Sequence, residues 1–302
     1  MSANLLNRRE FLGQAIVSGT GAALAIGTLG QAAEGKTKLG TPNAEKLGWR
    51  ISCNMYTFRD RSLFEAIEVL SRMGVRLVEP GFFLPLSKES PKLKTSEELT
   101  PEQRREMKKR MEDLGMKMPT FYAALEGNQS VYRKIFDFAK EMEVETLVAE
   151  PPPEAFEALD AMCEEYKMKL AVHNHPEGSG SKYWNPDVLV KACQGRSERI
   201  GGCPDTGHWV RSGLNTLESL RKYKGRIITI HLKDAEVLGK RDSRDVPLGT
   251  GKGNYGAIMQ QMFDWKWRGV MTIEYEHLSP RLVEDVRECV NYVEEFAKSK
   301  QA

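Results

Sequence analysis

The chain alternates eight times between two hydrophobic periods, and this repeat constrains its fold more than any other feature. Short apolar runs are typical of buried strands, and longer amphipathic stretches are typical of helices that pack on a sheet. The predicted strands cover residues 51–58, 76–81, 117–122, 146–150, 169–174, 200–205, 227–232 and 270–275. The predicted helices cover residues 62–73, 101–114, 129–142, 153–166, 186–194, 214–223, 254–264 and 281–298. Eight strand–helix units favour parallel strands that close into a single-domain (β/α)8 TIM barrel.

An open doubly wound sheet is the alternative fold for the same pattern. Its dinucleotide-binding form needs a glycine-rich turn after the first strand, and the sequence after residue 58 lacks one. Local signals support the predicted helix boundaries. Thr100, followed by Pro101 and by Gln103, is typical of a capped helix start. Gly74 and Gly115 are placed as helix ends just before strands.

Composition excludes several classes of protein. The 302 residues carry 44 basic and 42 acidic side chains, a net charge of +2, which argues against a nucleic-acid partner. The mean hydropathy is −0.48, and the one long apolar stretch is N-terminal, so a multi-span membrane protein is not expected. The five cysteines form no C-x-x-C pair and are expected to be buried thiols.

The N-terminus has the pattern of an export signal. Asn7-Arg8-Arg9-Glu10-Phe11-Leu12 resembles the twin-arginine motif, and a run rich in Gly and Ala follows it. We therefore predict a twin-arginine signal peptide over residues 1–33, a linker over 34–47 and the barrel over 48–298. Cleavage would leave no membrane span and place the protein in the periplasm or otherwise outside the cytoplasm. A transmembrane anchor is the alternative, although the glycines make this run a poor stable span.

Histidine and carboxylate side chains gather where a barrel performs chemistry. All five histidines lie between residues 173 and 277, at the ends of predicted strands, and these ends share the catalytic face of a barrel. Acidic residues occupy corresponding positions: Glu150, Asp205, Asp234 and Glu274. Mixed imidazole and carboxylate ligands suit divalent ions such as Mn²⁺, Zn²⁺ or Co²⁺. The sequence therefore predicts one divalent metal ion at the barrel mouth.

Three short motifs extend this prediction to a family. Residues 203–209 (Cys-Pro-Asp-Thr-Gly-His-Trp), 230–234 (Ile-His-Leu-Lys-Asp) and 272–276 (Thr-Ile-Glu-Tyr-Glu) resemble those of the xylose isomerase-like TIM barrel family. The resemblance covers residues 48–298. It implies that Asp205, His231 and Glu274 are three of four metal ligands. His173 stands where the family has a strand-five Glu, so the fourth ligand is either His173 or Glu150.

Roles for other residues follow from the resemblance and from their positions. Glu150 or Glu274 would be the general base, and His175 or His208 would protonate or orient the substrate. Arg211 and Lys233 would neutralise an oxyanion or a carboxylate. Trp184 and Trp209 could stack on a sugar, and Asp234 is a further candidate for substrate binding. The glycine-rich segment 249–253 lacks the Walker spacing but could hold a phosphate.

The expected function is that of a metal-dependent sugar isomerase or epimerase. Such an enzyme removes a proton next to a carbonyl and passes through a metal-stabilised enediolate. The His at position 173 weakens symmetric epimerase chemistry, so a β-elimination lyase or dehydratase acting on a keto sugar or 3-keto-glycoside is an alternative. An endonuclease IV-like nuclease and a non-catalytic sugar-binding barrel are further alternatives. The expected partner is a small carbohydrate, without a phosphate if the protein is exported, and homo-oligomer formation stays open.

Overall fold

The computed structural model describes residues 40–301. The predicted signal peptide (1–33) and the first residues of the predicted linker (34–39) lie outside this range. Within the range, α1 (Pro42–Lys46) is held against the C-terminal helix α10 (Leu282–Ser299). The backbone N–H groups of Asn43 and Ala44 donate to the Glu294 carboxylate at 2.9 and 3.0 Å. No helix among the described residues is both long enough and apolar enough to cross a membrane.

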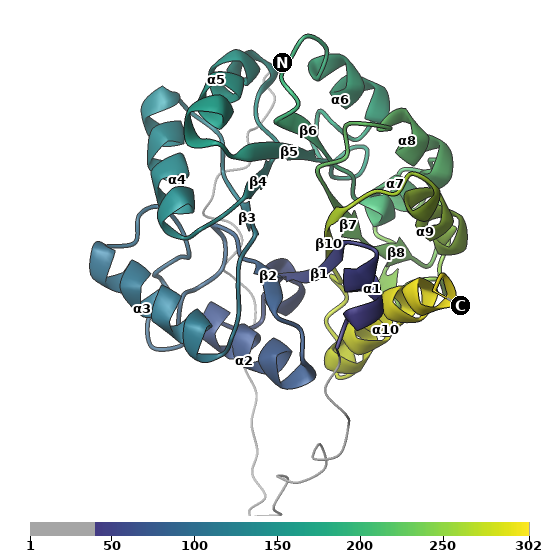
Figure 1. The fold of residues 1–302 in the computed structure, drawn as a ribbon, viewed down its shortest axis with the longest axis horizontal. Helices are drawn as coiled ribbons and strands as arrows, with labels where there is room; N and C mark the ends of the chain where they lie inside the picture. Colours follow the sequence, from purple (N-terminus) through teal and green to yellow (C-terminus); the bar gives the residue numbers. More distant parts are fainter. Residues whose placement is uncertain (1–39, 302) are drawn as a thin grey trace, which may run out of the picture. The chain divides into compact units, whose positions relative to one another are not determined.

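Eight parallel strands form a closed ring with helices around it (Figure 1). They are β1 (Trp49–Asn54), β2 (Leu77–Glu79), β3 (Thr120–Tyr122), β4 (Thr146–Ala149), β5 (Lys169–His173), β6 (Ile200–Cys203), β7 (Thr229–Leu232) and β10 (Gly269–Ile273). Two four-stranded sheets, β2-β1-β10-β7 and β3-β4-β5-β6, make up the ring. Parallel bridges join them on both sides, Leu77 to Lys117 and Gly202 to Ile227. This closure confirms the predicted barrel and excludes the open doubly wound sheet.

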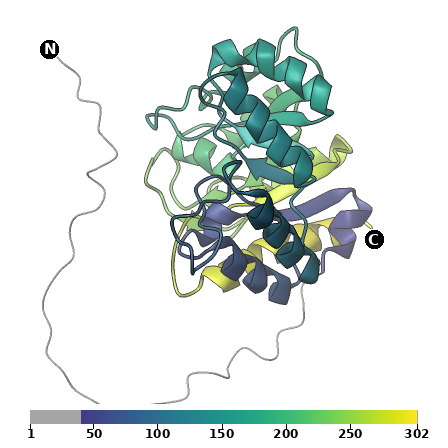
Figure 2. The same cartoon turned by 90° about the vertical axis from the view of Figure 1, so that its left-hand side faces the viewer.

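The outer helices begin and end largely where the sequence signals place them. They are α2 (Leu63–Met73), α3 (Pro101–Asp113), α4 (Gln129–Glu141), α5 (Phe156–Tyr166), α6 (Pro186–Ala192), α8 (Thr216–Lys222), α9 (Tyr255–Asp264) and α10. Thr100 and Gln103 form a reciprocal capping box at the start of α3. Gly74 ends α2 in the left-handed conformation, with φ at 94°. In Figures 1 and 2, α10 in yellow lies beside the purple segment at the start of the described chain, and Trp49 of β1 stacks on Phe296 of α10 at 6.0 Å between ring centroids.

Short elements at the mouth differ from the prediction. The first strand ends at Asn54, whose side chain accepts from the Tyr56 N–H and starts the 3-10 helix η1 (Met55–Phe58). Another short helix, α7 (Thr206–Arg211), follows β6 because the Asp205 side chain caps it. A third, the 3-10 helix η2 (Pro153–Ala155), precedes α5. The strands β8 (Asp234–Ala235) and β9 (Asp245–Val246) form an antiparallel pair beyond β7.

Strand alternation separates two hydrophobic clusters. Outward-facing residues join the large core between strands and helices, among them Leu147, Val172, Ile230 and Ile273. A small cluster of Val148, Ala171 and Cys203 fills the barrel interior. Because side chains alternate along a strand, the inward positions beyond this cluster direct residues into the mouth. All five cysteines are buried free thiols, as expected.

Candidate metal centre and active site

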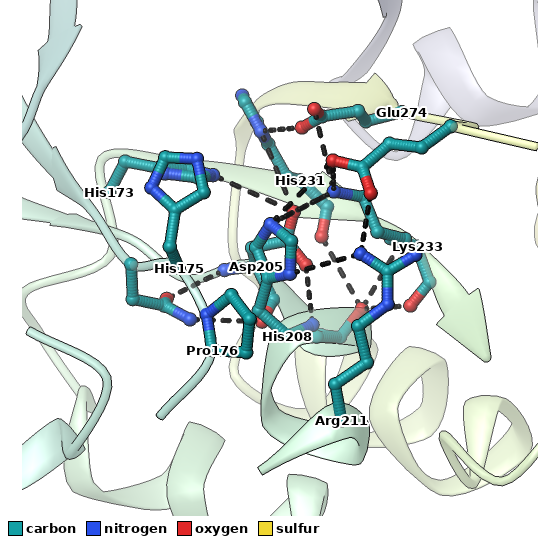
Figure 3. Close-up of polar contacts among 12 residues, drawn as sticks. His173, His175, Pro176, Asp205, His208, Arg211, His231, Lys233 and Glu274 are labelled. Atoms are coloured by element: carbon teal, nitrogen blue, oxygen red, sulfur yellow. Dashed lines mark hydrogen bonds and ion pairs between the residues drawn. The ribbon is translucent and has the colours of Figure 1, made fainter. Parts of the chain in front are cut away.

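Four side chains from four strand ends converge at the mouth of the barrel. They are His173 at the end of β5, Asp205 after β6, His231 on β7 and Glu274 after β10, and we call them the metal quartet. One nitrogen or oxygen atom from each lies within 4.8 Å of the others, and all four residues are buried. Figure 3 shows their side chains pointing toward one another. The inward parity of the strands, which the sequence predicts, accounts for this convergence.

The atoms of the metal quartet fit a divalent ion. His173 Nε2 and Asp205 Oδ2 are buried, and neither makes a hydrogen bond with any described residue. His173 Nε2 is 3.6 Å and His231 Nδ1 is 3.9 Å from Asp205 Oδ2. Two ligands that each bind one ion at about 2.1 Å are separated by roughly 3–4 Å. Buried polar atoms usually have a hydrogen-bond partner, whereas His173 Nε2 has none among the described residues and Asp205 Oδ2 faces the Lys233 ammonium, 3.0 Å away, so the two atoms could hold a cation.

A buried lysine supplies positive charge beside the metal quartet. The Lys233 ammonium is 0% exposed and lies 3.0 Å from Asp205 Oδ2, 3.4 Å from Glu274 Oε1 and 2.9 Å from Glu276 Oε1. Figure 3 shows the lysine entering between Asp205 and Glu274. Burial alone would lower the pKa of Lys233, but the three carboxylates outweigh it and raise this pKa. Lys233 therefore stays charged and holds the carboxylates in place.

Glu150 belongs to a second group, on the other side of His173. Its Oε1 lies 2.5 Å from His175 Nδ1 and 3.3 Å from His173 Nδ1, and its Oε2 accepts from Ser181 Oγ at 2.6 Å. Burial opposes ionisation of Glu150, but hydrogen bonds from His173 and His175 outweigh it and lower the pKa of this carboxyl. The structure therefore groups His173, rather than Glu150, with Asp205, His231 and Glu274.

A pocket of about 920 Å³ opens above these groups. Its polar end is lined by Glu150, His173, His175, His208, Glu274 and Glu276. The side chain of His175 is 45% exposed and that of His208 only 3%. Burial, together with the charge of Lys233, lowers the pKa of His208 to about 3, although Asp205 opposes this. His208 is therefore a neutral imidazole in the folded protein, with its Nε2 3.1 Å from the Lys233 ammonium.

Several residues predicted for substrate binding have other surroundings. Trp209 is 0% exposed and packs edge-on against Tyr223 in the outer core, at 5.5 Å between ring centroids. Its stacking on a sugar, predicted from the sequence, is wrong because it follows the Asp205 cap into α7 and turns away from the mouth. Trp184 is half-buried and does not line the pocket. Arg211 is in ion pairs with Asp245 and Glu276, at 2.6 and 2.5 Å.

The Asp234 carboxylate is bound by the glycine-rich segment and does not line the pocket. Its carboxylate accepts from the backbone N–H groups of Ala235, Gly249, Gly251 and Gly253, at 2.8 to 3.0 Å. The segment 249–253 therefore already binds an anion, namely the carboxylate of its own chain. The prediction that Asp234 binds substrate, and the phosphate hypothesis for this segment, are both wrong for this reason.

The structure adds residues that sequence reasoning missed. Glu276 lines the pocket and bridges Lys233 and Arg211. Glu79 of β2 is buried, with Oε1 2.7 Å from His231 Nε2, so it orients the imidazole of a metal-quartet residue. Four aromatic residues also line the pocket: Tyr56, Phe82, Phe83 and Tyr122. Strand parity could have found Glu276, since it shares a face with Glu274.

A family model agrees with this fold. The model of the xylose isomerase-like TIM barrel matches residues 67–294, which is more than half of the chain. The chain belongs to the xylose isomerase-like TIM barrel family. The protein y4fM of Sinorhizobium fredii is 25% identical over 138 residues, which are 46% of this chain and 43% of that protein. The match thus spans less than half of the relative's length.

Solved structures show the same fold. An uncharacterized protein of Parabacteroides distasonis is 26% identical with a TM-score of 0.65, covering 82% of this chain and 99% of that one. A D-tagatose 3-epimerase-like protein is 18% identical with a TM-score of 0.66, covering 84% and 100%. A xylose isomerase-like protein of Mycobacterium smegmatis, in complex with magnesium, is 16% identical with a TM-score of 0.66, covering 84% and 98%.

Proposed function

We propose that this protein is a divalent-metal-dependent enzyme that removes a proton next to the carbonyl of a small carbohydrate. One observation carries the proposal: His173 Nε2 and Asp205 Oδ2 are buried 3.6 Å apart beneath a pocket, and neither makes a hydrogen bond with a described residue. His231 and Glu274 complete the set of ligands. A bound divalent ion would supply Lewis-acid stabilisation of negative charge on substrate oxygens.

The chain's own residues divide the remaining work. Glu150 faces the pocket as an ionised carboxylate and is the candidate base, oriented by Ser181 Oγ. His175 is exposed to the pocket and contacts Glu150, so it can pass the proton onward or return it. The ammonium of Lys233 keeps Glu274 and Glu276 ionised and fixed in position.

One asymmetry favours elimination as the second candidate reaction. Glu276 is tied to two cationic side chains and Glu274 to Lys233 and His231. Glu150, in contrast, has only hydroxyl and imidazole partners within the described residues. A single free base next to one face of a keto sugar suits one-sided proton removal and loss of a β-substituent. A reversible epimerase needs a base on each face.

Deuterium exchange in heavy water tests the proposal directly. Protein loaded with Mn²⁺, Zn²⁺ or Co²⁺ is incubated with a panel of free keto sugars and NMR follows the proton next to the carbonyl. We expect exchange with metal and none after chelation; exchange of equal rate in metal-free protein would overturn the proposal. Glu150→Gln should slow exchange by about 10²–10⁴-fold. Glu154→Gln, a change of an exposed carboxylate in η2, is the matched control and should exchange like the wild type.

Export through the twin-arginine route is a separate proposal. It rests on the sequence around Arg8 and Arg9. Replacing both arginines with lysine should leave the protein in the cytoplasmic fraction, while the wild type is recovered from the periplasm. Equal distribution of the two forms would contradict the signal.

A further inference from the structure

Part of the pocket lining is an aromatic surface. It comprises Tyr56 in η1, Phe82 and Phe83 after β2, and Tyr122 at the end of β3, and we call it the aromatic wall. These segments follow β1, β2 and β3, whereas the metal quartet comes from β5, β6, β7 and β10. The aromatic wall and the metal quartet therefore come from different strand ends around one pocket and meet where the Tyr122 ring lies 5.3 Å from the His173 ring.

The aromatic wall is held in a fixed arrangement. Ring centroids are 5.3 Å apart for Tyr56 and Phe83, 5.7 Å for Phe82 and Phe83, and 6.2 Å for Phe83 and Tyr122. The Phe82 N–H donates to the Tyr122 carbonyl at 3.3 Å, which ties the loop after β2 to β3. A Cβ at Gly81 would lie 2.4 Å from Phe83 Cε1, so the absence of a side chain here lets the Phe83 ring keep its place. The rings are thus placed before any ligand binds.

Part of this apolar surface is exposed. Phe82 is 39% and Tyr56 is 37% exposed, among the few large apolar side chains of the described residues that reach solvent. An exposed aromatic surface in a cleft costs free energy unless a ligand covers it. The aromatic wall is also continuous with the polar end of the pocket, because Tyr122 Oη lies 3.3 Å from His173 Nδ1.

The pocket is larger than one sugar ring requires. Its volume is about 920 Å³. That is near the top of the roughly 300–1,000 Å³ range that encloses drug-sized ligands, and a hexose has only about a dozen heavy atoms. Glu126, Ser179 and Lys182 line the same pocket and offer polar groups to a ligand.

We propose that the substrate carries a second ring in glycosidic linkage, which stacks on Phe82 and Tyr56 while the reacting sugar occupies the polar end. This rests on the proposed function, since the reacting end is the metal quartet and Glu150. The second ring is either a sugar or an aryl group, because both present an apolar face to an aromatic side chain. The aromatic wall then selects a glycoside over a free monosaccharide.

Calorimetry on the metal-loaded full chain tests the aromatic wall without relying on catalysis. The probes are methyl β-D-glucopyranoside, phenyl β-D-glucopyranoside and cellobiose. One or both two-ring probes should bind about 2- to 10-fold more tightly than the methyl glucoside, the range expected for one aromatic stack. The phenyl and cellobiose titrations distinguish an aryl group from a sugar as the second ring.

Substitutions then locate the preference. Phe82→Ala should remove the two-ring preference, and Phe82→Tyr should retain it. Tyr56→Ala is a second variant in case Phe82→Ala does not fold. Val188→Ala, on the exposed face of α6, is the control for loss of a surface apolar side chain.

The outcomes separate the two proposals. Equal affinity of wild type for one-ring and two-ring probes, or no binding of any of them, would overturn the aromatic-wall inference. A two-ring preference that survives in both Phe82→Ala and Tyr56→Ala would also overturn it. Failure of proton exchange with free keto sugars, alongside a preference that depends on Phe82, would overturn the proposed reaction and leave the aromatic wall standing.

Discussion

Two aspartates at neighbouring strand ends of the mouth have opposite surroundings. Asp205 follows β6 and Asp234 follows β7, and their exposed fractions are 0% and 1%. Asp234 accepts four backbone hydrogen bonds, three of them from glycines of segment 249–253. Asp205 Oδ1 accepts one, from the His208 N–H at 2.9 Å, and Oδ2 accepts none from the described residues. Asp205 Oδ2 instead faces the Lys233 ammonium at 3.0 Å and the imidazoles of His173 and His231. A buried carboxylate that its own loop satisfies is structural, whereas one whose oxygen faces imidazole nitrogens is suited to a metal centre.

Replacing Asp205 should have the largest effect. Asp205→Ala removes the ligand that contacts both His173 and Lys233, so we expect loss of bound divalent ion and a fall in proton exchange of about 10²–10⁴-fold. Elemental analysis of the purified variant gives the metal content, and NMR in heavy water gives the rate. Asp113→Ala, on the exposed surface of α3, is the control. Retention of a full equivalent of metal in Asp205→Ala would show that Asp205 is not a metal ligand and does not differ from Asp234 in this way.

The same change at Asp234 should affect stability and spare the metal. Asp234→Ala leaves four backbone N–H groups without their acceptor, and an unsatisfied buried donor costs about 1–3 kcal/mol. Since water can reach part of the segment, we expect a loss of about 3 kcal/mol in the free energy of unfolding, measured by urea denaturation. Metal content should equal that of the wild type. Loss of metal with unchanged stability would show that Asp234 belongs to the metal centre.

Gly251 tests the same contrast from the segment that binds Asp234. A Cβ at this position would lie 2.4 Å from Asp234 Oδ1 and 2.5 Å from the Ala235 carbonyl oxygen. Gly251→Ala should therefore destabilise the protein by about 1–3 kcal/mol, the usual cost of overpacking. Gly256→Ala, where no atom lies within 4 Å of the new Cβ in α9, is the matched control and should be neutral or slightly stabilising. Equal melting temperatures of the two variants would argue against a tight clamp on Asp234.

The smallest expected effect is on stability at acid pH and involves His208, whose backbone N–H donates to Asp205. The folded-state pKa of this imidazole is lowered to about 3 by burial and by Lys233, and the unfolded value is about 6.5. Between these values the unfolded chain binds a proton that the folded chain does not. Stability of the metal-free protein is therefore lost as the pH falls below about 6.5, by at most about 1.4 kcal/mol per unit.

The measurement compares wild type with His208→Gln in urea titrations from pH 7 to pH 5. Glutamine carries no titrating proton, so the variant should lose about 2 kcal/mol less than the wild type over this range. Parallel pH curves for the two proteins would show that another group sets the acid sensitivity.

Much of the site follows from strand parity, which the sequence displays. Ala171 and His173 share a face, as do Thr229 and His231, so an inward barrel face directs both histidines to the mouth. The predicted element boundaries that proved wrong, at the ends of β1 and β6, depend on single side chains. Asn54 and Asp205 each cap a short helix, η1 and α7, and shorten the predicted strand or add a helix. Such caps compete locally with strand pairing, and an apolar pattern cannot show which one prevails.

The sequence alone determined the eightfold repeat, the closure of the barrel and the side of it on which chemistry is placed, because hydrophobic period and chain direction are local properties. Only the tertiary structure decided which polar groups satisfy one another. In the folded protein Asp234 binds the glycine-rich segment, Trp209 packs in the core, and Glu276 forms an ion pair with Lys233. The tertiary structure also brought Phe82 beside Tyr122 across two strands. Hydrogen-bond satisfaction and packing depend on distances between segments far apart in the chain, and those distances exist only after folding.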